Sequence, residues 1–380
     1  MIKIVADKHI PFLKGVLDQY ADVIYVPGEE IKNLDLSKTD VLITRSRTYC
    51  NKELLNNTRI KLIASATIGI DHIDTEYCKN NGIRVKNAPG CNSASVCQYI
   101  ITALCFLSEK LKFSLQGKTI GIVGHGNVGS KVASFAKIMG MNVLINDPPK
   151  QRLNKINNYV SIEEIIKKSD IISLHVPLTH SGEDKTINLI DKNFLSKMSA
   201  SQILINSSRG GVVEEDSLKI AFNEQRIAGI VLDVWKNEPD IDREILDKSI
   251  IGTPHIAGYS IDGKANGTAM VVKIVSDFFK LGINNWFPDN LPCPEDTIIL
   301  PEISDNDDEV ILKNIIAKTY DIHHDNNQLK LHLEKFEFFR HNHPIRREFP
   351  VFTVQTSGLS KQLIQKLKKL GFNLIPGISQ

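Results

Sequence analysis

Three residues in the middle of the chain, an arginine, a glutamate and a histidine, have side chains that could act together in an acid–base reaction. Arg209 lies in the stretch INSSRGG, Glu238 in LDVWKNEP and His255 in TPHIAGYS. Histidine side chains ordinarily titrate near neutral pH and can accept the hydroxyl proton while hydride leaves the same carbon. A neighbouring glutamate stabilises the imidazolium, and an arginine binds a carboxylate through two parallel hydrogen bonds. Each residue alone would more often have a structural role, but the set predicts a catalytic site.

A glycine loop at residues 124 to 129 has the G-x-G-x-x-G spacing of dinucleotide-binding turns. The loop follows the apolar stretch TIGIV and opens a predicted helix near Asn127, and the next apolar stretch ends at Asp147. Gly124 permits the tight turn, Gly126 lets the backbone approach a pyrophosphate, and Gly129 lets the helix pack closely on the strand. Backbone N–H groups at the helix start bind the phosphates, and the Asp147 carboxylate accepts the ribose hydroxyls. Because that charge repels a 2′-phosphate, the sequence favours NAD over NADP.

Short apolar stretches alternate with helical patterns over most of the chain, which is typical of an α/β fold. Residues 1 to 90 contain four predicted strands, and an amphipathic helix follows from about Val96 to Leu111. From residue 119 to about 255, six apolar strands alternate with helices, as in a doubly wound parallel sheet. The predicted strands are IKIVA, DVLI, KLIAS and GIRV in the first block, and TIGIV, NVLIN, DIISLHV, QILINS, IAGIVLD and SIIGT in the second.

The late position of the glycine loop, after more than a hundred residues, indicates an inserted domain. We expect an NAD-binding domain at residues 96–261 to interrupt a smaller, discontinuous α/β domain formed by residues 1–95 and 262–285. The proline-rich stretch NNWFPDNLPCPEDTIILP then predicts a linker. In the third block, residues 286–380, the patterns predict helices at 305–318 and 360–371 and strands around QLKLHLEKF and FTVQTS.

Composition and charge limit the classes of partner that we expect for the protein. The 380 residues include 46 basic and 44 acidic side chains, so neither a nucleic acid nor a membrane surface is an expected partner. The first residues lack the pattern of a signal peptide, and the six cysteines include no C-x-x-C pair. These features favour a cytoplasmic protein without disulfides or structural metal. Small molecules and copies of the same chain are the expected partners.

The last 85 or so residues hold five of the eleven histidines and a pair of neighbouring arginines. No cysteine accompanies these histidines, so solvated loop positions are favoured over metal ligands. The arginine pair, Arg346 and Arg347, either closes over a substrate phosphate or lies on the surface. The five histidines are His323, His324, His332, His341 and His343.

The catalytic motifs resemble those of the D-isomer-specific 2-hydroxyacid dehydrogenase family. That family's motifs read N-x-x-R-G, E-P and P-H-x-A-G, and this chain has NSSRG, EP and PHIAG. The resemblance covers about residues 1 to 283 and implies a Rossmann NAD-binding domain inserted into a flavodoxin-like substrate domain. It also implies that Arg209 binds the substrate carboxylate and that Glu238 and His255 form the acid–base pair. The cofactor that it implies is NAD.

A narrower resemblance, which includes a tail of about 90 residues, is to one group within this family. The stretches SATIGIDHID, NAPGCNSASV and HIAGYSIDGKANGT carry it. It implies oxidation of a phosphorylated 2-hydroxy acid in pyridoxal 5′-phosphate biosynthesis, with the tail forming a homodimer as a C-terminal α/β dimerisation domain. The substrate contacts that it implies are Ser46, Thr67 and Tyr259, to which charge alone adds Arg45. The further NAD contacts that it implies are Asn127, Val128, His175, Val176, Ser207, Ser208, Asp233 and Gly258.

Two alternatives stay open from the sequence. The first is another member of the same family, such as a 3-phosphoglycerate dehydrogenase. The second is an NAD-sensing regulatory protein that keeps the fold without catalysis, against which the retention of Arg209, Glu238 and His255 argues. For Arg45, a solvated surface position is the alternative to a phosphate contact.

Overall fold

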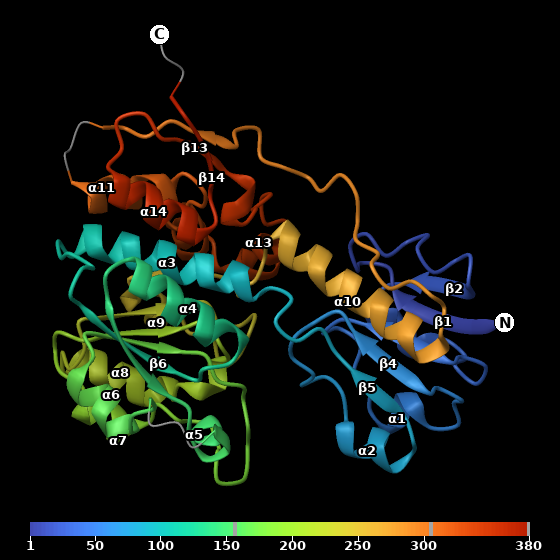
Figure 1. The fold of residues 1–380 in the computed structure, drawn as a ribbon. Coiled ribbons are helices and arrows are strands. Elements are labelled where there is room, and N and C mark those ends of the chain that lie inside the picture. Colours follow the sequence, from blue (N-terminus) through green and yellow to red (C-terminus); the bar gives the residue numbers. More distant parts are fainter. Residues whose placement is uncertain (155–157, 304–306, 378–380) are drawn as a thin grey trace. The chain divides into compact units, whose positions relative to one another are not determined.

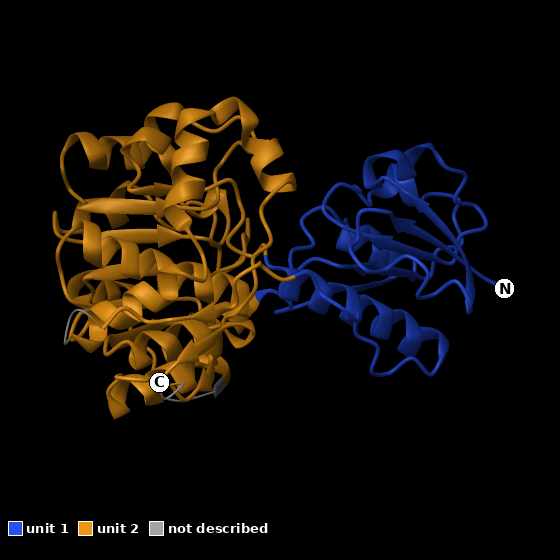
Figure 2. Cartoon of the chain, turned by 90° about the horizontal axis from the view of Figure 1, so that it is seen from above, with its two compact units in different colours: residues 1–92, 260–292 blue, residues 93–259, 293–380 orange. Residues whose placement is uncertain are grey.

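The computed structural model describes residues 1–154, 158–303 and 307–377, and the chain divides into two units (Figure 2). One unit consists of residues 1–92 and 260–292, and the other consists of residues 93–259 and 293–380. Each unit is therefore built from two separate stretches of chain. The chain passes from one unit to the other after Asn92, after Tyr259 and after Pro292.

A five-stranded parallel sheet with the order β2-β1-β3-β4-β5 forms the centre of the first unit (Figure 1). This is the flavodoxin-like order of a doubly wound sheet. Every residue of β3 and β4 is buried, as expected for central strands covered on both faces. The sequence prediction missed β2, an edge strand in which only Ala21 is buried. The strands are β1 (Ile2–Asp7), β2 (Ala21–Val26), β3 (Val41–Thr44), β4 (Leu62–Ser65) and β5 (Arg84–Lys86).

Helix α10 (Ile261–Phe279) comes from the second stretch of this unit and packs on its sheet. Three of its valines join the hydrophobic cluster that holds Ile4 and Val41. The helix begins at Ser260, whose Oγ accepts the backbone N–H of Gly263 at 2.8 Å and so caps the first turn. The other helices of the unit are η1 (Gly28–Asn33), α1 (Lys52–Leu55) and α2 (Thr75–Asn80).

The second unit contains a six-stranded parallel sheet with the order β11-β10-β9-β8-β6-β7. All six strands predicted from apolar stretches are present, and the prediction of a doubly wound parallel sheet is confirmed. The strands are β6 (Thr119–Val123), β7 (Asn142–Asn146), β8 (Ile171–Leu174), β9 (Ile203–Asn206), β10 (Gly229–Leu232) and β11 (Ile251–Gly252).

Helices cover both faces of this sheet, because alternate residues of each strand point to opposite sides. In β9, Ile203 and Ile205 join one hydrophobic cluster with residues of α3 and α4, whereas Leu204 joins another cluster with residues of α6 to α9. The helices are α3 (Ser93–Lys110), α4 (Asn127–Ile138), α5 (Pro148–Asn154), α6 (Ile162–Lys168), α7 (Lys192–Lys197), η2 (Gly210–Val212), α8 (Glu215–Asn223) and α9 (Arg243–Lys248).

The C-terminal stretch of the second unit packs against α3 and α4, on the side away from the sheet (Figure 1). It has a small parallel sheet with the order β12-β13-β14. Its elements are β12 (Ile298–Ile299), α11 (Asp308–Ala317), α12 (Ile322–Leu331), η3 (Leu333–Lys335), α13 (Phe336–His341), η4 (Phe349–Val351), β13 (Thr353–Gln355), α14 (Lys361–Leu370) and β14 (Asn373–Ile375).

The predicted strand around QLKLHLEKF is wrong, because this stretch is helical. Its alternating leucines do not share one buried face, since Leu329 is buried whereas Leu331 is 71% exposed. The start of α12 is instead fixed by Asp321, whose carboxylate accepts the backbone N–H of His324 at 2.9 Å. The helix cap at Asp321 is therefore consistent with the helix seen here, whereas the alternating leucines do not form a strand.

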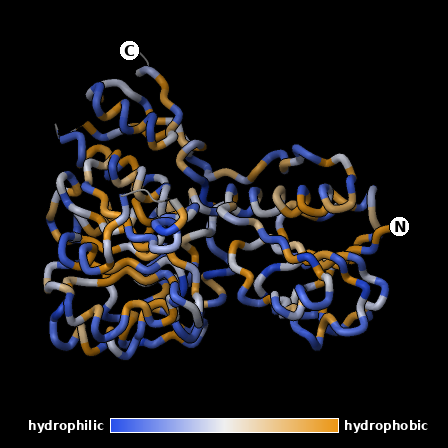
Figure 3. Tube along the Cα trace, turned by 60° about the horizontal axis from the view of Figure 1, so that its bottom comes forward, coloured by the Kyte–Doolittle hydropathy of each residue, from blue (hydrophilic) through white to orange (hydrophobic). Residues whose placement is uncertain are grey.

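Hydrophobic residues concentrate along the strands and on the inner faces of the helices (Figure 3). Across the described parts of the chain, no helix is both long and apolar enough to cross a membrane. The six cysteines are free thiols, and Cys293 alone among them is exposed.

Candidate active site

The glycine loop connects β6 to α4 and has the backbone geometry that its residue types predict. Gly124 has φ of +92°, a conformation that residues with side chains rarely adopt. A Cβ atom at Gly129 would lie 2.0 Å from the carbonyl oxygen of Gly124, so helix and loop approach too closely for any side chain. A Cβ atom at Gly126 would meet nothing within 4 Å. The open space at Gly126, beside the first residues of α4, Asn127 and Val128, fits a pyrophosphate.

The loops after β6 and β8 lie against each other. The backbone N–H of His175 donates to the carbonyl of Val123 at 2.7 Å, and a Cβ atom at Gly124 would lie 2.9 Å from Cγ1 of Val176. Strand β6 has β7 on one side and β8 on the other, so the chain reverses its winding direction at this point. Doubly wound sheets bind dinucleotides at such a switch point. The imidazole of His175 bonds Ser173, and burial lowers the pKa of His175 to about 3, so the ring is neutral.

Asp147 follows β7 and is tied to the glycine loop. One carboxylate oxygen accepts the backbone N–H of His125 at 2.8 Å, and the other accepts that of Lys150 at 3.0 Å. The ammonium group of Lys150 bonds the carbonyl of His125. The structure thus holds Asp147 beside the loop that was predicted to bind the phosphates, and it places a positive charge close by.

Glu238 and His255 meet as a hydrogen-bonded pair. The Nδ1 atom of His255 lies 2.7 Å from Oε2 of Glu238, while Oε1 of Glu238 accepts the backbone N–H of Trp235 at 3.0 Å. Burial alone would raise the pKa of Glu238, but the contacts with His255 and Trp235 hold it below its usual value. Because Nδ1 faces a carboxylate, it carries a proton, and Nε2 is the ring nitrogen left to exchange a proton with a substrate.

The segment that carries His255 is anchored by Asp233, which is 1% exposed. Its carboxylate accepts the hydroxyl of Thr253 at 2.7 Å and the backbone N–H groups of Ile256 and Ala257 at 2.8 and 2.9 Å. Burial raises the pKa of Asp233, although the charge of His255 and these hydrogen bonds oppose the shift. The cofactor contact predicted for Asp233 stays a prediction; the bonds seen here hold the histidine loop.

Arg209 follows β9 in a loop that touches the Glu238 loop. A Cβ atom at Gly210 would lie 1.9 Å from the carbonyl oxygen of Trp235, so the two loops are in direct backbone contact. Asn206 organises the turn, since its side chain accepts both the N–H and the hydroxyl of Ser208 and donates to the carbonyl of Arg209. The hydroxyl of Ser207 is buried and has no hydrogen-bond partner among the described residues. Such an orphaned donor fits a bound ligand at this edge of the sheet.

The predicted substrate residues Arg45, Ser46 and Thr67 belong to the first unit. They follow β3 and β4, which are neighbouring strands, so they lie at one edge of that sheet. The Nε atom of Arg45 lies 3.0 Å from the buried carboxylate of Asp7, and Ser46 is exposed. The hydroxyl of Thr67 donates to the carbonyl of Gly69 at 2.8 Å. The ion pair with Asp7 thus holds the guanidinium of Arg45 in place.

Comparisons with known proteins now decide the family. Residues 106–257 match the family model described as D-isomer specific 2-hydroxyacid dehydrogenase, NAD binding domain, and residues 294–371 match a domain of unknown function. The erythronate-4-phosphate dehydrogenase of Bacteroides thetaiotaomicron is 44% identical over 93% of this chain and 99% of its own length. That of Hahella chejuensis is 37% identical over 98% of this chain and 99% of its own. The chain belongs to the erythronate-4-phosphate dehydrogenase family.

Solved structures share the fold of this erythronate-4-phosphate dehydrogenase family member. D-lactate dehydrogenase from Aquifex aeolicus, complexed with NAD and lactic acid, is 29% identical with a TM-score of 0.57, covering 74% of this chain and 97% of that chain. The NAD-bound 3-phosphoglycerate dehydrogenase of Entamoeba histolytica is 25% identical with a TM-score of 0.62, and the match covers 77% of this chain and 99% of that chain. The predicted Rossmann fold, oxidoreductase class and NAD cofactor are therefore confirmed.

Sequence reasoning missed one charged residue beside the predicted catalytic pair, Glu238 and His255. Nη1 of Arg340, in α13, lies 4.0 Å from Oε2 of Glu238, and its guanidinium lies 5.9 Å from the ring centre of Tyr259. Arg340 belongs to none of the motifs in the sequence. It directly precedes the polar stretch HNHPIRRE, and it has no regular spacing from the predicted catalytic residues.

The arginines and histidines of the tail have structural contacts. Arg346 and Arg347 are 3% and 7% exposed, so neither lies on the surface, which was one of the two alternatives. The other alternative, a contact with a substrate phosphate, stays a prediction; the contacts seen are from Arg346 to backbone carbonyls and from Arg347 to Cys293. His343 lies 3.1 Å from Asp325, and the ring of His323 stacks on Phe106. Within the described ranges, no group of three or more metal-binding side chains is found.

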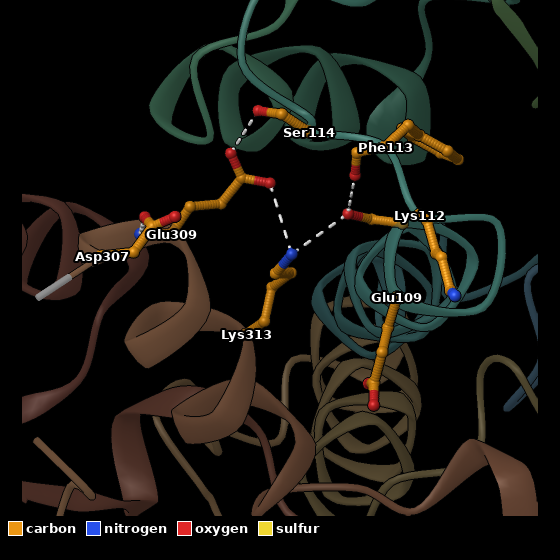
Figure 4. A pocket seen from close by; sticks show the side chains of 8 residues that line it. Glu109, Lys112, Phe113, Ser114, Asp307, Glu309 and Lys313 are labelled. Atoms are coloured by element: carbon orange, nitrogen blue, oxygen red, sulfur yellow. Dashed lines mark hydrogen bonds and ion pairs between the residues drawn. The ribbon is translucent and has the colours of Figure 1, made fainter. Parts of the chain in front are cut away.

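A pocket of about 310 Å³ lies between the end of α3 and the start of α11 (Figure 4). Two of its charges compensate each other, since Glu309 pairs with Lys313 at 3.5 Å, and Glu309 also accepts hydrogen bonds from Ser114 and the backbone of Leu115. None of the predicted catalytic or cofactor residues lines it.

Proposed function

We propose that the protein oxidises 4-phospho-D-erythronate to (R)-3-hydroxy-2-oxo-4-phosphooxybutanoate with NAD, as a step of pyridoxal 5′-phosphate biosynthesis in the cytoplasm. The observation that carries the catalytic part is the 2.7 Å contact between His255 and Glu238. The identity to erythronate-4-phosphate dehydrogenases over nearly the whole chain supports the choice of substrate. The five buried free thiols are in keeping with a reducing compartment.

In this proposal, His255 is the general base. Its Nε2 atom accepts the proton of the substrate 2-hydroxyl, and the Glu238 carboxylate at Nδ1 stabilises the imidazolium that forms. Arg209 binds the substrate carboxylate with its planar guanidinium and so orients the carbon that loses hydride. NAD supplies the hydride acceptor when it is bound.

The glycine loop and its neighbours hold the cofactor in this proposal. The open space at Gly126 and the N–H groups at the start of α4 receive the pyrophosphate. Asp147 accepts the ribose hydroxyls, and the buried Ser207 hydroxyl gains the partner that it lacks among the described residues. The backbone at His175, Val176, Ser208 and Gly258 completes the site.

Arg45, Ser46, Thr67 and Tyr259 bind the phosphorylated substrate in this proposal. A bond from Nε to Asp7 fixes the direction of the Arg45 side chain, and its two Nη groups are the ones proposed to meet the phosphate. A cation that is already oriented loses less conformational entropy on binding than a free surface arginine.

The C-terminal stretch forms the homodimer in this proposal. Large hydrophobic side chains are exposed in this stretch. Burying them in an interface between two copies of the chain would remove apolar surface from water, which is favourable. They are Ile298, Leu300, Ile303, Leu331, Phe338 and Ile345.

The deciding experiment measures NADH formation from 4-phosphoerythronate and from 3-phosphoglycerate in parallel, at equal enzyme concentration. We expect turnover with 4-phosphoerythronate and little with 3-phosphoglycerate. Preference for 3-phosphoglycerate would replace the proposed substrate. Tight NAD binding without turnover of either acid would instead identify a cofactor sensor.

A further inference from the structure

One buried arginine joins the C-terminal stretch to the loop that carries the catalytic histidine. The guanidinium of Arg346 donates to the backbone carbonyl of Ile256 at 3.3 Å and to that of Ala257 at 2.5 Å. It also donates to the carbonyl of Ser95, at the start of α3, at 3.2 Å. Its charge lies 4.6 Å from the ring centre of Tyr320, which covers one face of the guanidinium.

The same two residues of the loop are also bound by Asp233. Its carboxylate takes the N–H groups of Ile256 and Ala257, while Arg346 takes their carbonyls. A buried anion and a buried cation therefore hold two consecutive residues through their backbone alone. No side-chain specificity is involved, so the arrangement fixes the path of the chain.

His255 directly precedes these residues and has an unfavourable backbone conformation. Its φ is +57°, in the left-handed region, which costs a residue with a side chain about 1–2 kcal/mol. Such a conformation persists only where the surroundings enforce it. The residues on the C-terminal side of His255 are the ones that Asp233 and Arg346 hold.

A second contact supports the loop from the C-terminal stretch. Strand β11 leads into the histidine loop, and the side chain of Asn326 in α12 accepts the backbone N–H of Gly252 at 2.9 Å. Lys330 in the same helix donates to the carbonyl of Ser249, just before β11, at 2.5 Å. The C-terminal stretch thus binds the chain both before and after His255.

We propose that Arg346 is a positioning residue that keeps the imidazole of His255 aimed at the substrate. The C-terminal stretch, which matches a family of unknown function, then completes the active site of its own chain in addition to any role in dimer formation. This inference rests on the proposed role of His255 as the general base. It assigns Arg346 no contact with substrate or cofactor.

The test compares Arg346→Met with Arg347→Met in the full-length protein. Arg347 is the neighbouring residue and is also buried, and its guanidinium donates to Cys293 Sγ. Both variants therefore remove a buried cation of the same type. Arg346→Lys is the third variant, because a single ammonium keeps the charge but lacks the planar fork that reaches several carbonyls.

We expect Arg346→Met to lower kcat by about 10- to 100-fold, because small errors in the position of a catalytic group have effects of this size. The dissociation constant of NAD should change by less than about 3-fold, since the glycine loop is untouched. Arg346→Lys should recover part of the lost kcat, and Arg347→Met should keep kcat within about 3-fold of the wild type.

Hydrogen exchange provides a readout that does not depend on turnover. The amides of Ile256 and Ala257 should exchange faster in Arg346→Met than in Arg347→Met, because one side of their support is lost. If Arg346→Met does not fold, Arg346→Lys carries the same comparison. Equal loss of kcat in the Arg346 and Arg347 variants, or wild-type kcat and exchange in Arg346→Met, would overturn the inference. A wild-type enzyme that oxidises neither acid would contradict the proposed function instead.

Discussion

The imidazole of His255 and the carboxylate of Glu238 lie 2.7 Å apart, although 17 positions separate them in the sequence. The two residues come from loops that follow different strands, β10 and β11. These strands are neighbours in a parallel sheet, so their carboxyl ends meet at one edge.

Replacing His255 by glutamine should lower kcat at least about 100-fold, because the proposed general base is lost. NAD binding should be unchanged, since His255 is not part of the glycine loop. Steady-state kinetics and NAD titration measure the two effects. Glu238→Gln keeps the shape of the pair but removes its charge, so it should lower kcat as well; near-normal turnover in either variant would remove that residue from its role.

Gly126 and Gly129 should respond differently to alanine. Gly126→Ala places a methyl group in open space, so the free energy of unfolding should change by less than about 1 kcal/mol while NAD binding weakens at least about 10-fold. Gly129→Ala drives a methyl group into the Gly124 carbonyl and should destabilise the protein by about 1–3 kcal/mol. Urea unfolding and NAD titration compare the two variants. Full NAD affinity in Gly126→Ala would contradict the proposed pyrophosphate site.

Removing the charge of Asp147 should weaken the preference for NAD over NADP. In Asp147→Ala the repulsion of a 2′-phosphate is gone, and the ammonium of Lys150 stays close to the glycine loop. We expect the ratio of kcat/KM for NAD to that for NADP to fall at least about 10-fold. The double variant with Lys150→Ala should lose most of the gain in NADP use. Unchanged selectivity in Asp147→Ala would contradict the ribose contact.

His175 should make the protein sensitive to acid. Burial lowers its folded-state pKa from 6.5 to about 3, so between these values the unfolded chain binds a proton that the folded protein does not. Its contribution to stability is therefore complete above about pH 6.5 and falls as the pH drops, by up to about 1.4 kcal/mol per pH unit.

Urea unfolding of wild type and His175→Gln at pH 8, 6 and 5 tests this linkage. At pH 8 both side chains are neutral, so the difference between the two proteins there reports packing alone. The variant should lose less stability than the wild type from pH 8 to pH 5. Parallel loss in both proteins would show that His175 does not cause the acid sensitivity.

Exposed leucines of the tail should matter for assembly. Leu331, in α12, is 71% exposed, and Leu153, in α5, is 80% exposed. Leu331→Glu should raise the dimer dissociation constant at least about 10-fold, because it puts a charge into the proposed interface, whereas Leu153→Glu should leave it unchanged. Sedimentation velocity across a dilution series distinguishes these outcomes. A monomeric wild type, or equal effects of both substitutions, would contradict a dimer built on this stretch.

The sequence predicts the two large sheets because their strands are continuous apolar stretches separated by helical patterns. It misses β2 because an edge strand with one buried residue carries a weak pattern. It also predicts Glu238 beside His255, since motif residues at strand ends share one sheet edge. Arg340 and Arg346 are different: Arg346 reaches Ala257 across 89 positions, and only the packing of the C-terminal stretch brings them together. No periodicity or motif encodes such a contact.

The left-handed backbone at His255 has a consequence for judging related chains. A truncated chain that ends near residue 293 would retain the motifs of Arg209, Glu238 and His255 and the glycine loop. A search for these motifs would therefore identify it as a working dehydrogenase. In that chain, however, no guanidinium would bind the backbone carbonyls of the two residues that follow the histidine, Ile256 and Ala257. In the proposed role of Arg346, catalysis therefore depends partly on a residue that belongs to no recognised motif.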